Sequence, residues 1–267
     1  MLNGGGMIKY KKMHGNGNDF IVIENLTETN SLTKSKIIKM GDRKRGLGFD
    51  QLITINPPKK SNHDFYVKFF NSDGSEADMC MNGVRSVGAF LWDAALAPKK
   101  PLLLGTKSKP ILIQPTNTKK VKVILDYPVQ MMVPKLETKL LEKYGVKKYK
   151  FINAGNHHLV IETKNVFSYN LEGLSSKLRK RDFFKNVNIS LFTKRGQALE
   201  LRTNEAGAGE TLSCGSASAA VASFNLKDMP PLKIISAGGE LSLRKINDKL
   251  EMTGPAEFIC EGIWLKN

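Results

Sequence analysis

The sequence predicts an α+β fold of two pseudo-symmetric domains, each a curved mixed β-sheet or barrel wrapped around one central helix. Three observations lead to this prediction. A strand, a helix and a hairpin follow one another twice along the chain. In each copy a cysteine stands before a run of small and apolar residues, ADMCMNGVRSVGAF (77–90) and TLSCGSASAAVASF (211–224). Both copies close on a proline, in DYP (126–128) and TGP (253–255). These matches favour duplication over chance similarity.

The first copy begins with FYVKFF (65–70), whose aromatic and β-branched residues are typical of a strand. The polar segment NSDGSE (71–76) predicts a turn, and a helix follows Cys80. Apolar residues at helical spacing predict that one face of this helix is buried: Val84, Val87, Leu91 and Ala94. The segments ILIQ and VKVILDYP, joined by a turn at 116–118, then predict a hairpin.

The second copy repeats this order. ALELRT (198–203) alternates as a strand does, NEAGAGE (204–210) predicts a turn, and a helix follows Cys214. Because this helix carries Ala, Ser and Val almost all round, we expect it to be enclosed on every side. ELSLRKI, a turn at Asn247 and Asp248, and LEMTGP predict another hairpin.

The repeat places the domain border just after the first hairpin. We expect residues 1–125 to form the half that carries Cys80 and residues 126–267 the half that carries Cys214. The last strand, about 256–267, is able to pack on the first half.

The composition is that of an ordinary globular protein, with 267 residues, 41% of them hydrophobic and 25% charged. No apolar run approaches the ~20 residues that cross a bilayer, so we expect no membrane partner. The start, MLNGGGMIKY, lacks the apolar core of a secretory signal. A cytoplasmic location is therefore expected.

The net charge of +16 raises nucleic acid as a partner. The lysines, however, are spread over connecting segments, without a basic helix or a known nucleic-acid motif. We interpret them as a solvated surface and expect no nucleic-acid partner. Three cysteines without a C-x-x-C pair, and four histidines without metal-ligand spacing, predict no metal site.

Cys80 and Cys214 are each expected at a helix N-terminus, which faces unpaired N–H groups and the positive end of the helix dipole. This setting lowers a cysteine pKa from ~8.5 toward neutrality and makes the thiol a usable base or nucleophile. Cys260, in the strand-like EFICEGIW, is interpreted instead as a small buried hydrophobe.

Two such thiols on opposite sides of one substrate suit inversion at carbon. One thiolate removes a proton and the other thiol supplies one to the opposite face, while the helix N-termini stabilise the enolate-like charge. This chemistry requires no metal, nucleotide or pyridoxal, so no cofactor is expected.

Five segments occur in a fixed order: MHGNGNDFIVI (13–23), GFDQL (48–52), FNSDGSEADMCMNGVR (70–85), AGNHHLVI (154–161) and GAGETLSCGS (207–216). In them the chain closely resembles the diaminopimelate epimerases over nearly its whole length. The resemblance implies the fold of that family, a homodimer, and interconversion of LL- and meso-diaminopimelate in lysine and peptidoglycan-precursor synthesis. Cys80 and Cys214 would each be acid in one direction and base in the other.

The resemblance also implies the residues that bind substrate: Asn18, Gln51, Asn71, Met81, Asn82, Asn156, Asn188, Glu205, Ala206, Gly215 and Ser216. Asn71, Asn156 and Asn188 would hold the distal amino-acid end, since an amide both donates and accepts. His158 and Glu205 would support the reacting amino acid and the thiols. Taken alone, Asn18, Asn71 and Asn156 are typical of turns, Gln51 of a surface and His158 of a packed core.

Three positions depart from the family pattern. Ala206 stands where an arginine usually pairs with the distal carboxylate, Met81 replaces a glycine, and His157 replaces a proline. Two alternatives therefore stay open. One is a racemase of another amino acid on the same fold. The other is a basic, non-enzymatic binding protein that retains the fold.

Overall fold

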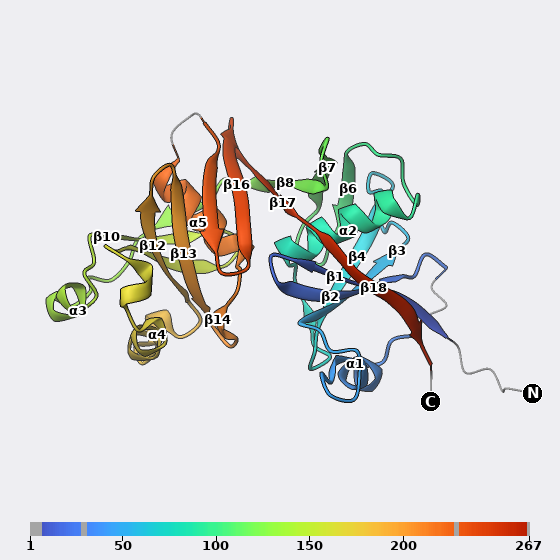
Figure 1. Ribbon diagram of the computed structural model, residues 1–267, viewed down its shortest axis with the longest axis horizontal. Helices are drawn as coiled ribbons and strands as arrows, with labels where there is room; N and C mark the ends of the chain where they lie inside the picture. Colours follow the sequence, from blue (N-terminus) through green and yellow to red (C-terminus); the bar gives the residue numbers. More distant parts are fainter. Residues whose placement is uncertain (1–6, 28–30, 227–229, 266–267) are drawn as a thin grey trace, which may run out of the picture. The chain divides into compact units, whose positions relative to one another are not determined.

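The computed structural model describes residues 7–27, 31–226 and 230–265 (Figure 1). The chain divides into two compact units. Unit 1 comprises residues 1–124 and 254–267, and unit 2 comprises residues 125–253. No helix in the described ranges is long and apolar enough to cross a membrane.

Unit 1 combines a mixed sheet with two helices. Its strands are β1 (Ile8–Gly15), β2 (Asn18–Glu24), β3 (Gln51–Asn56), β4 (Phe65–Asn71), β5 (Glu76–Ala77), β6 (Leu102–Gly105), β7 (Ile111–Pro115), most of β8 (Lys120–Asp126), and β18 (Glu257–Trp264). Helix α1 (Lys34–Gly41) lies between β2 and β3 in the chain, and α2 (Met81–Asp93) lies between β5 and β6. The last strand belongs to this unit because β18 pairs antiparallel with β1.

The tight turn of the β1–β2 hairpin fixes the position of Asn18. Gly15 pairs with Asn18, so the turn consists of Asn16 and Gly17, with φ of 53° and 82°. Two consecutive positive φ angles match a type I′ turn, for which Asn-Gly is the preferred sequence. The turn places Asn18 at the first position of β2, beside the start of β3.

Unit 2 contains strands β9 (Val129–Met131), β10 (Lys148–Asn153), β11 (His157–Glu162), β12 (Asn188–Arg195), β13 (Ala198–Glu205), β14 (Gly209–Thr211), β15 (Leu232–Ser236), β16 (Gly239–Ile246) and β17 (Lys249–Pro255), of which β17 ends in unit 1. Its helices are α3 (Thr138–Lys143), α4 (Leu171–Arg179) and α5 (Gly215–Asn225), with short 3₁₀ turns η1 (Val166–Ser168) and η2 (Asp182–Phe184). An apolar cluster that includes Leu174, Phe184 and Leu191 packs α4 against the strands.

The two units repeat one pairing scheme. In unit 1, β2 and β3 pair parallel, β3 and β4 antiparallel, and β4 and β6 parallel. In unit 2, β11 and β12, β12 and β13, and β13 and β15 pair in the same three ways. Three successive antiparallel strands follow in each, β6–β7–β8 and β15–β16–β17. The predicted α+β fold of two similar sheet-and-helix halves is therefore confirmed.

Each unit encloses one helix. In α2 every residue from Asn82 to Gly88 is buried, so the helix is covered on nearly all sides and not only on the predicted face. Gly83 explains how closely the sheet approaches, because an added Cβ would lie 2.9 Å from Ile53 and Phe69. In α5 the run from Ala217 to Ala222 is buried, as its small side chains predict.

Candidate active site

The two cysteines that the sequence singles out occupy the same position in their units. Cys80 is the N-cap residue of α2, and Cys214 is the N-cap residue of α5. Their backbones are alike, with φ/ψ of −126°/121° and −122°/114°. Neither side chain caps its own helix by a hydrogen bond. Each thiol has a polar partner on another segment, Asn18 for Cys80 and Glu205 for Cys214.

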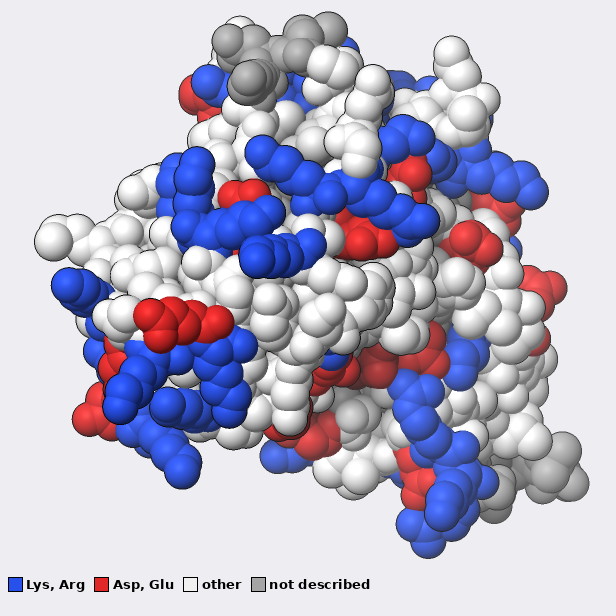
Figure 2. Space-filling view, turned by 60° about the vertical axis from the view of Figure 1, so that its left-hand side comes forward, with Lys and Arg blue, Asp and Glu red and all other residues white. Residues whose placement is uncertain are grey.

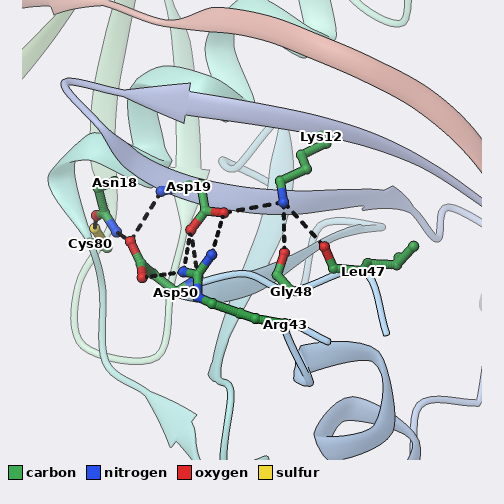
Figure 3. Close-up of polar contacts among 8 residues, drawn as sticks. All are labelled: Lys12, Asn18, Asp19, Arg43, Leu47, Gly48, Asp50 and Cys80. Atoms are coloured by element: carbon green, nitrogen blue, oxygen red, sulfur yellow. Dashed lines mark hydrogen bonds and ion pairs between the residues drawn. The ribbon is translucent and has the colours of Figure 1, made fainter. Parts of the chain in front are cut away.

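Cys80 lies next to two of the predicted substrate-binding asparagines. Its thiol donates to Oδ1 of Asn18 at 3.3 Å, and Nδ2 of Asn82 reaches the same oxygen at 3.5 Å. Asn18 in turn donates from Nδ2 to the Asp50 carboxylate at 2.7 Å (Figure 3). The amide of Asn18 thus connects the thiol to a charged group.

A buried arginine supports this site from within the helix. Arg85 is fully buried, and its guanidinium donates to Asn16 Oδ1 at 3.0 Å, Asn82 Oδ1 at 2.7 Å and the Pro255 carbonyl at 3.1 Å. Burial lowers the pKa of Arg85 to about 10, against the attraction of a negative charge on Cys80. By the same attraction, the guanidinium stabilises a thiolate on Cys80.

Gln51 and Asn71 form a second pair in unit 1. Gln51 donates from Nε2 to Asn71 Oδ1 at 3.0 Å, and Asn71 donates from Nδ2 to Ser75 Oγ at 3.1 Å. The Gln51 Oε1 atom is buried and accepts no hydrogen bond from the described residues. A buried acceptor without a donor is costly, so a ligand N–H group at this position would be stabilised. Met81, which follows Cys80, is half-buried.

Cys214 faces a carboxylate where Cys80 faces an amide. Its thiol donates to Glu205 Oε2 at 3.1 Å and lies 3.3 Å from Ser216 Oγ. Thr211 donates to the other oxygen, Glu205 Oε1, at 2.7 Å. This second contact leaves Oε2 directed at sulfur.

The position at a helix N-terminus does not lower the pKa of Cys214, and that expectation is wrong for this residue. Burial, and then the negative charge of Glu205, raise the pKa of Cys214 well above its ordinary value, whereas Ser216 and the Ala217 amide act in the opposite direction. Desolvation and a nearby carboxylate outweigh the partial charge of the helix end. Cys214 therefore carries its proton at neutral pH.

His158 joins the Cys214 group through Ser216. Its Nε2 atom lies 2.7 Å from Asn156 Oδ1 and 3.0 Å from Ser216 Oγ. The ring is fully buried, and burial lowers the pKa of His158 to about 3, so the imidazole is neutral. Because Asn156 Oδ1 only accepts, Nε2 carries the ring proton. Ser216 is then free to donate toward the sulfur of Cys214.

Asn188 and Ala206 are brought together at the ends of β12 and β13. The Ala206 N–H donates to Asn188 Oδ1 at 2.9 Å. The side chain at 206 is a methyl group, which cannot pair with a carboxylate. Gly215, the first residue of α5 and the residue after Cys214, is buried.

Three charged residues of this region escaped prediction from the sequence. Arg85 and Asp50 contact predicted site residues, and Arg43 contacts Asp50 at 2.8 Å. A signal was present for Arg85, since it is the one charge among the small, apolar and uncharged polar residues from Met81 to Trp92. Asp50 and Arg43 lie in a polar segment, where charges are ordinary.

Other features of the described residues involve none of the predicted site residues. Cys260 is exposed on β18, so its interpretation as a buried hydrophobe is wrong. Its strand pairs with one edge of β1, and most of its side chains are exposed.

A hollow of about 450 Å³ in unit 2 is lined by Leu141, Val146, Lys147, Lys148, Tyr149, Lys150 and Phe224, none of them a predicted site residue. Basic side chains form several separate groups with acidic ones among them (Figure 2). Within the described ranges, no group of three or more His, Cys, Asp or Glu is placed to hold a metal ion.

The chain matches known proteins over most of its length. The family described as Diaminopimelate epimerase matches residues 10–131 and 150–259. A diaminopimelate epimerase of Psychrobacter sp. (strain PRwf-1) is 31% identical over 97% of this chain and 94% of its own length. The corresponding protein of Psychrobacter arcticus is 30% identical over the same shares.

Solved structures share the fold at lower identity. A PhzF-family phenazine biosynthesis protein of Bacillus anthracis has a TM-score of 0.77 at 16% identity, covering 97% of this chain and 99% of its own. A hydroxyproline epimerase of Agrobacterium vitis has a TM-score of 0.66 at 12% identity, covering 100% and 95%. The family match and the two Psychrobacter relatives place this chain in the diaminopimelate epimerase family of isomerases.

Proposed function

We propose that this protein is a diaminopimelate epimerase that interconverts LL- and meso-2,6-diaminopimelate. The observation that carries the proposal is the pair of N-cap cysteines, each hydrogen-bonded to a polar partner outside its own helix. Proton transfer between the α-carbon and these two thiols needs no pyridoxal phosphate. The family relatives supply the substrate class.

The charges around the thiols assign their roles in one direction. Cys214 holds its proton, since burial and Glu205 raise its pKa, and it acts as the acid. Arg85 favours a thiolate on Cys80, which acts as the base and takes the α-proton. In the reverse direction Cys214 must lose its proton first, and the Glu205 carboxylate at 3.1 Å is the group placed to accept it.

Removal of the α-proton places negative charge on the substrate carboxylate. The backbone N–H groups of the first turns of α2 and α5 suit that charge. Asn82 in α2, and Gly215 and Ser216 in α5, lie in these turns. We assign Gln51, whose Oε1 lacks a donor among the described residues, to a substrate N–H group, and Asn71, Asn156 and Asn188 to the distal end of the substrate.

Isotope exchange tests this proposal. Incubation with LL-diaminopimelate in deuterated water should place deuterium at the α-carbon and build up the meso isomer. The Cys214→Ser variant, which keeps a small polar group at that helix end, serves as the matched control and should form no meso product. Absence of exchange with both stereoisomers would exclude this substrate.

A second candidate is an epimerase or racemase for an amino acid without a distal carboxylate. Ala206 favours it, because its methyl side chain replaces a carboxylate partner and its N–H is already bound to Asn188. Met81 favours it too, by adding bulk beside Cys80. Chiral chromatography after incubation with a panel of L-amino acids separates the candidates. Under this second function, Ala206→Arg should lower turnover of the true substrate, whereas under the first it should lower KM for diaminopimelate.

We also propose a homodimer and a cytoplasmic location. Strand β18 exposes Phe258, Ile259 and Ile263 by 42%, 51% and 49%, apolar side chains that a second copy would cover. A reducing compartment suits the free thiols. Light scattering should give twice the chain mass, and Ile259→Lys should shift it to the monomer mass. A monomer for the unaltered protein would contradict the dimer.

A further inference from the structure

The segment between α1 and β3 carries an ion-pair network to the start of β2 (Figure 3). Arg43 binds Asp19 through two nitrogens, at 3.1 and 2.8 Å, and binds Asp50 Oδ1 at 2.8 Å. Lys12 donates to Asp19 at 3.2 Å and to the carbonyls of Leu47 and Gly48 at 3.1 and 2.9 Å. The network therefore attaches this segment to β1 and β2.

The two carboxylates are also locked to each other's backbone. Asp50 N–H donates to Asp19 Oδ1 at 2.9 Å, and Asp19 N–H donates to Asp50 Oδ2 at 3.1 Å. Asp50 Oδ2 thus stands at a fixed place beside Asn18, while Oδ1 is held by Arg43. Arg43 and Asp50 are 56% and 44% exposed, so their pair adds little to stability, and its effect is on orientation.

The carboxylate dictates which way the neighbouring amide faces. A carboxylate only accepts hydrogen bonds, so Asn18 must turn its NH₂ group toward Asp50, at 2.7 Å. The amide oxygen then points the other way, to the thiol of Cys80 at 3.3 Å and, at the longer distance of 3.5 Å, to Nδ2 of Asn82. Because that oxygen can only accept, it stabilises the S–H form and not the thiolate.

We propose that Asp50, anchored by Arg43, is a positioning residue that keeps the Asn18 oxygen directed at the Cys80 thiol. Arg85 favours the thiolate and the Asn18 oxygen favours the thiol, so the two groups act in opposite directions on the protonation of Cys80. A substrate ammonium that takes the Asn18 oxygen removes the acceptor and releases the thiol to ionise. This last step rests on the proposed function, whereas the orientation of the amide does not.

The pH dependence of alkylation tests the orientation directly. Each protein is treated with iodoacetamide over a range of pH, and modification is followed by mass spectrometry; Cys80, Cys214 and Cys260 fall in different tryptic peptides. In Asp50→Asn the new amide can donate to the Asn18 oxygen, so Asn18 can turn its NH₂ group to sulfur. The alkylation midpoint of Cys80 should fall by about one pH unit, because the amide turns and a carboxylate charge is lost. Arg43→Gln separates these two causes, since it keeps the Asp50 charge, and loss of a cation alone would raise the midpoint.

Two further variants complete the experiment. Arg43→Gln should lower the Cys80 midpoint by about half as much, because Asp50 stays charged but loses its anchor. Arg45→Gln is the matched control, since it removes an arginine from the same segment that is 86% exposed and pairs with Asp42. It should leave the midpoint unchanged. The Cys214 midpoint should be constant in all three variants.

A Cys80 midpoint in Asp50→Asn within about 0.2 unit of the unaltered protein, or above it, would overturn the inference. If Asp50→Asn does not fold, Arg43→Gln decides by the same criterion. The assay uses no substrate, so the outcomes separate. If the Cys80 midpoint shifts in the variants but the protein exchanges no amino-acid α-proton, only the proposed function is excluded. If the protein is an active epimerase but the midpoint does not shift, only this inference is excluded.

Discussion

The two cysteine sites are built on one scaffold and differ in the partner of the thiol. Phe20 pairs with Gln51 in the β2–β3 register, and His158 pairs with Asn188 in the β11–β12 register. Asn18 and Asn156, each two residues earlier, therefore correspond. Asn18 contacts its thiol directly, whereas Asn156 contacts the imidazole of His158.

The next strand of each unit, β4 and β13, differs in the opposite way: here the residue of unit 2 contacts the thiol and that of unit 1 does not. Asn71 pairs with Gln51, and the register of Ile189 with Asn204 places Glu205 beside Asn188 in the same way. Glu205 reaches the thiol of Cys214, whereas Asn71 bonds to Gln51. Five residues after each cysteine the helices carry Arg85 and Ala219. One thiol thus has a buried cation nearby and the other a carboxylate, so repetition preserved the two sulfur positions while the charges around them diverged.

The largest effect should come from removing either sulfur. Cys80→Ala and Cys214→Ala should each lower epimerase turnover by about a thousandfold or more, because inversion needs a base and an acid. Both variants should keep the far-ultraviolet circular dichroism of the unaltered protein. Substantial turnover in either variant would show that a single thiol is sufficient and would contradict the assignment of one acid and one base to the two sites.

Glu205→Gln should make the second site resemble the first. Without the carboxylate charge the pKa of Cys214 falls, and its alkylation midpoint should drop by about one unit while that of Cys80 is constant. Turnover should fall about 10- to 100-fold, since the proton acceptor is lost. An unmoved Cys214 midpoint would mean that burial alone sets its pKa.

Arg85→Met tests the cation in the first site. The change leaves Asn16, Asn82 and the Pro255 carbonyl without their buried donor, and should lower the free energy of unfolding by about 3 kcal/mol. Urea denaturation measures it. The corresponding change in the other helix, Ala219→Ser, should cost less because Ala219 has no side chain that could anchor such a network. Equal losses would contradict this assignment.

His158 should make stability depend on acid. Its pKa is about 3 when folded, below the ordinary 6.5, so its contribution is complete above pH 6.5 and is lost as the pH falls from 6.5 toward 3. At pH 5 the loss is about 2 kcal/mol relative to pH 7. In His158→Gln the stability difference between pH 7 and 5 should shrink by that amount. His157→Gln, at the exposed neighbouring residue, should change the difference much less, because burial is the main cause of the low pKa of His158 and the charge of His157 is the smaller one.

The smallest effect is expected at the third cysteine. Cys260 is exposed, so Cys260→Ser should change turnover less than about twofold and stability by less than about 0.5 kcal/mol. Kinetic assay and urea unfolding check both. A large loss would show that Cys260 is packed within the proposed dimer interface on β18, and not at its solvent-exposed margin.

Local sequence signals predicted most of the fold. Alternating strands, the two helices after cysteine and both hairpins follow from periodicity and turn residues, which act within a few positions. The burial of helix α2 was underestimated. Its seven-residue buried run includes Asn82, Arg85 and Ser86, and polar residues such as these are expected to be exposed when each is considered alone. Burial of these polar groups depends on partners distant in the sequence, such as the Pro255 carbonyl.

The sequence by itself determined the duplicated α+β scaffold, the helix-start position of both cysteines and the family. Only the tertiary structure decided which side chain each thiol faces, that burial and Glu205 raise the pKa of Cys214, and that Asp50 contacts the amide beside Cys80. The physical reason is how far apart in the sequence the interacting residues lie. Periodicity and capping depend on neighbours along the chain, whereas desolvation and hydrogen bonds depend on segments that meet only after folding.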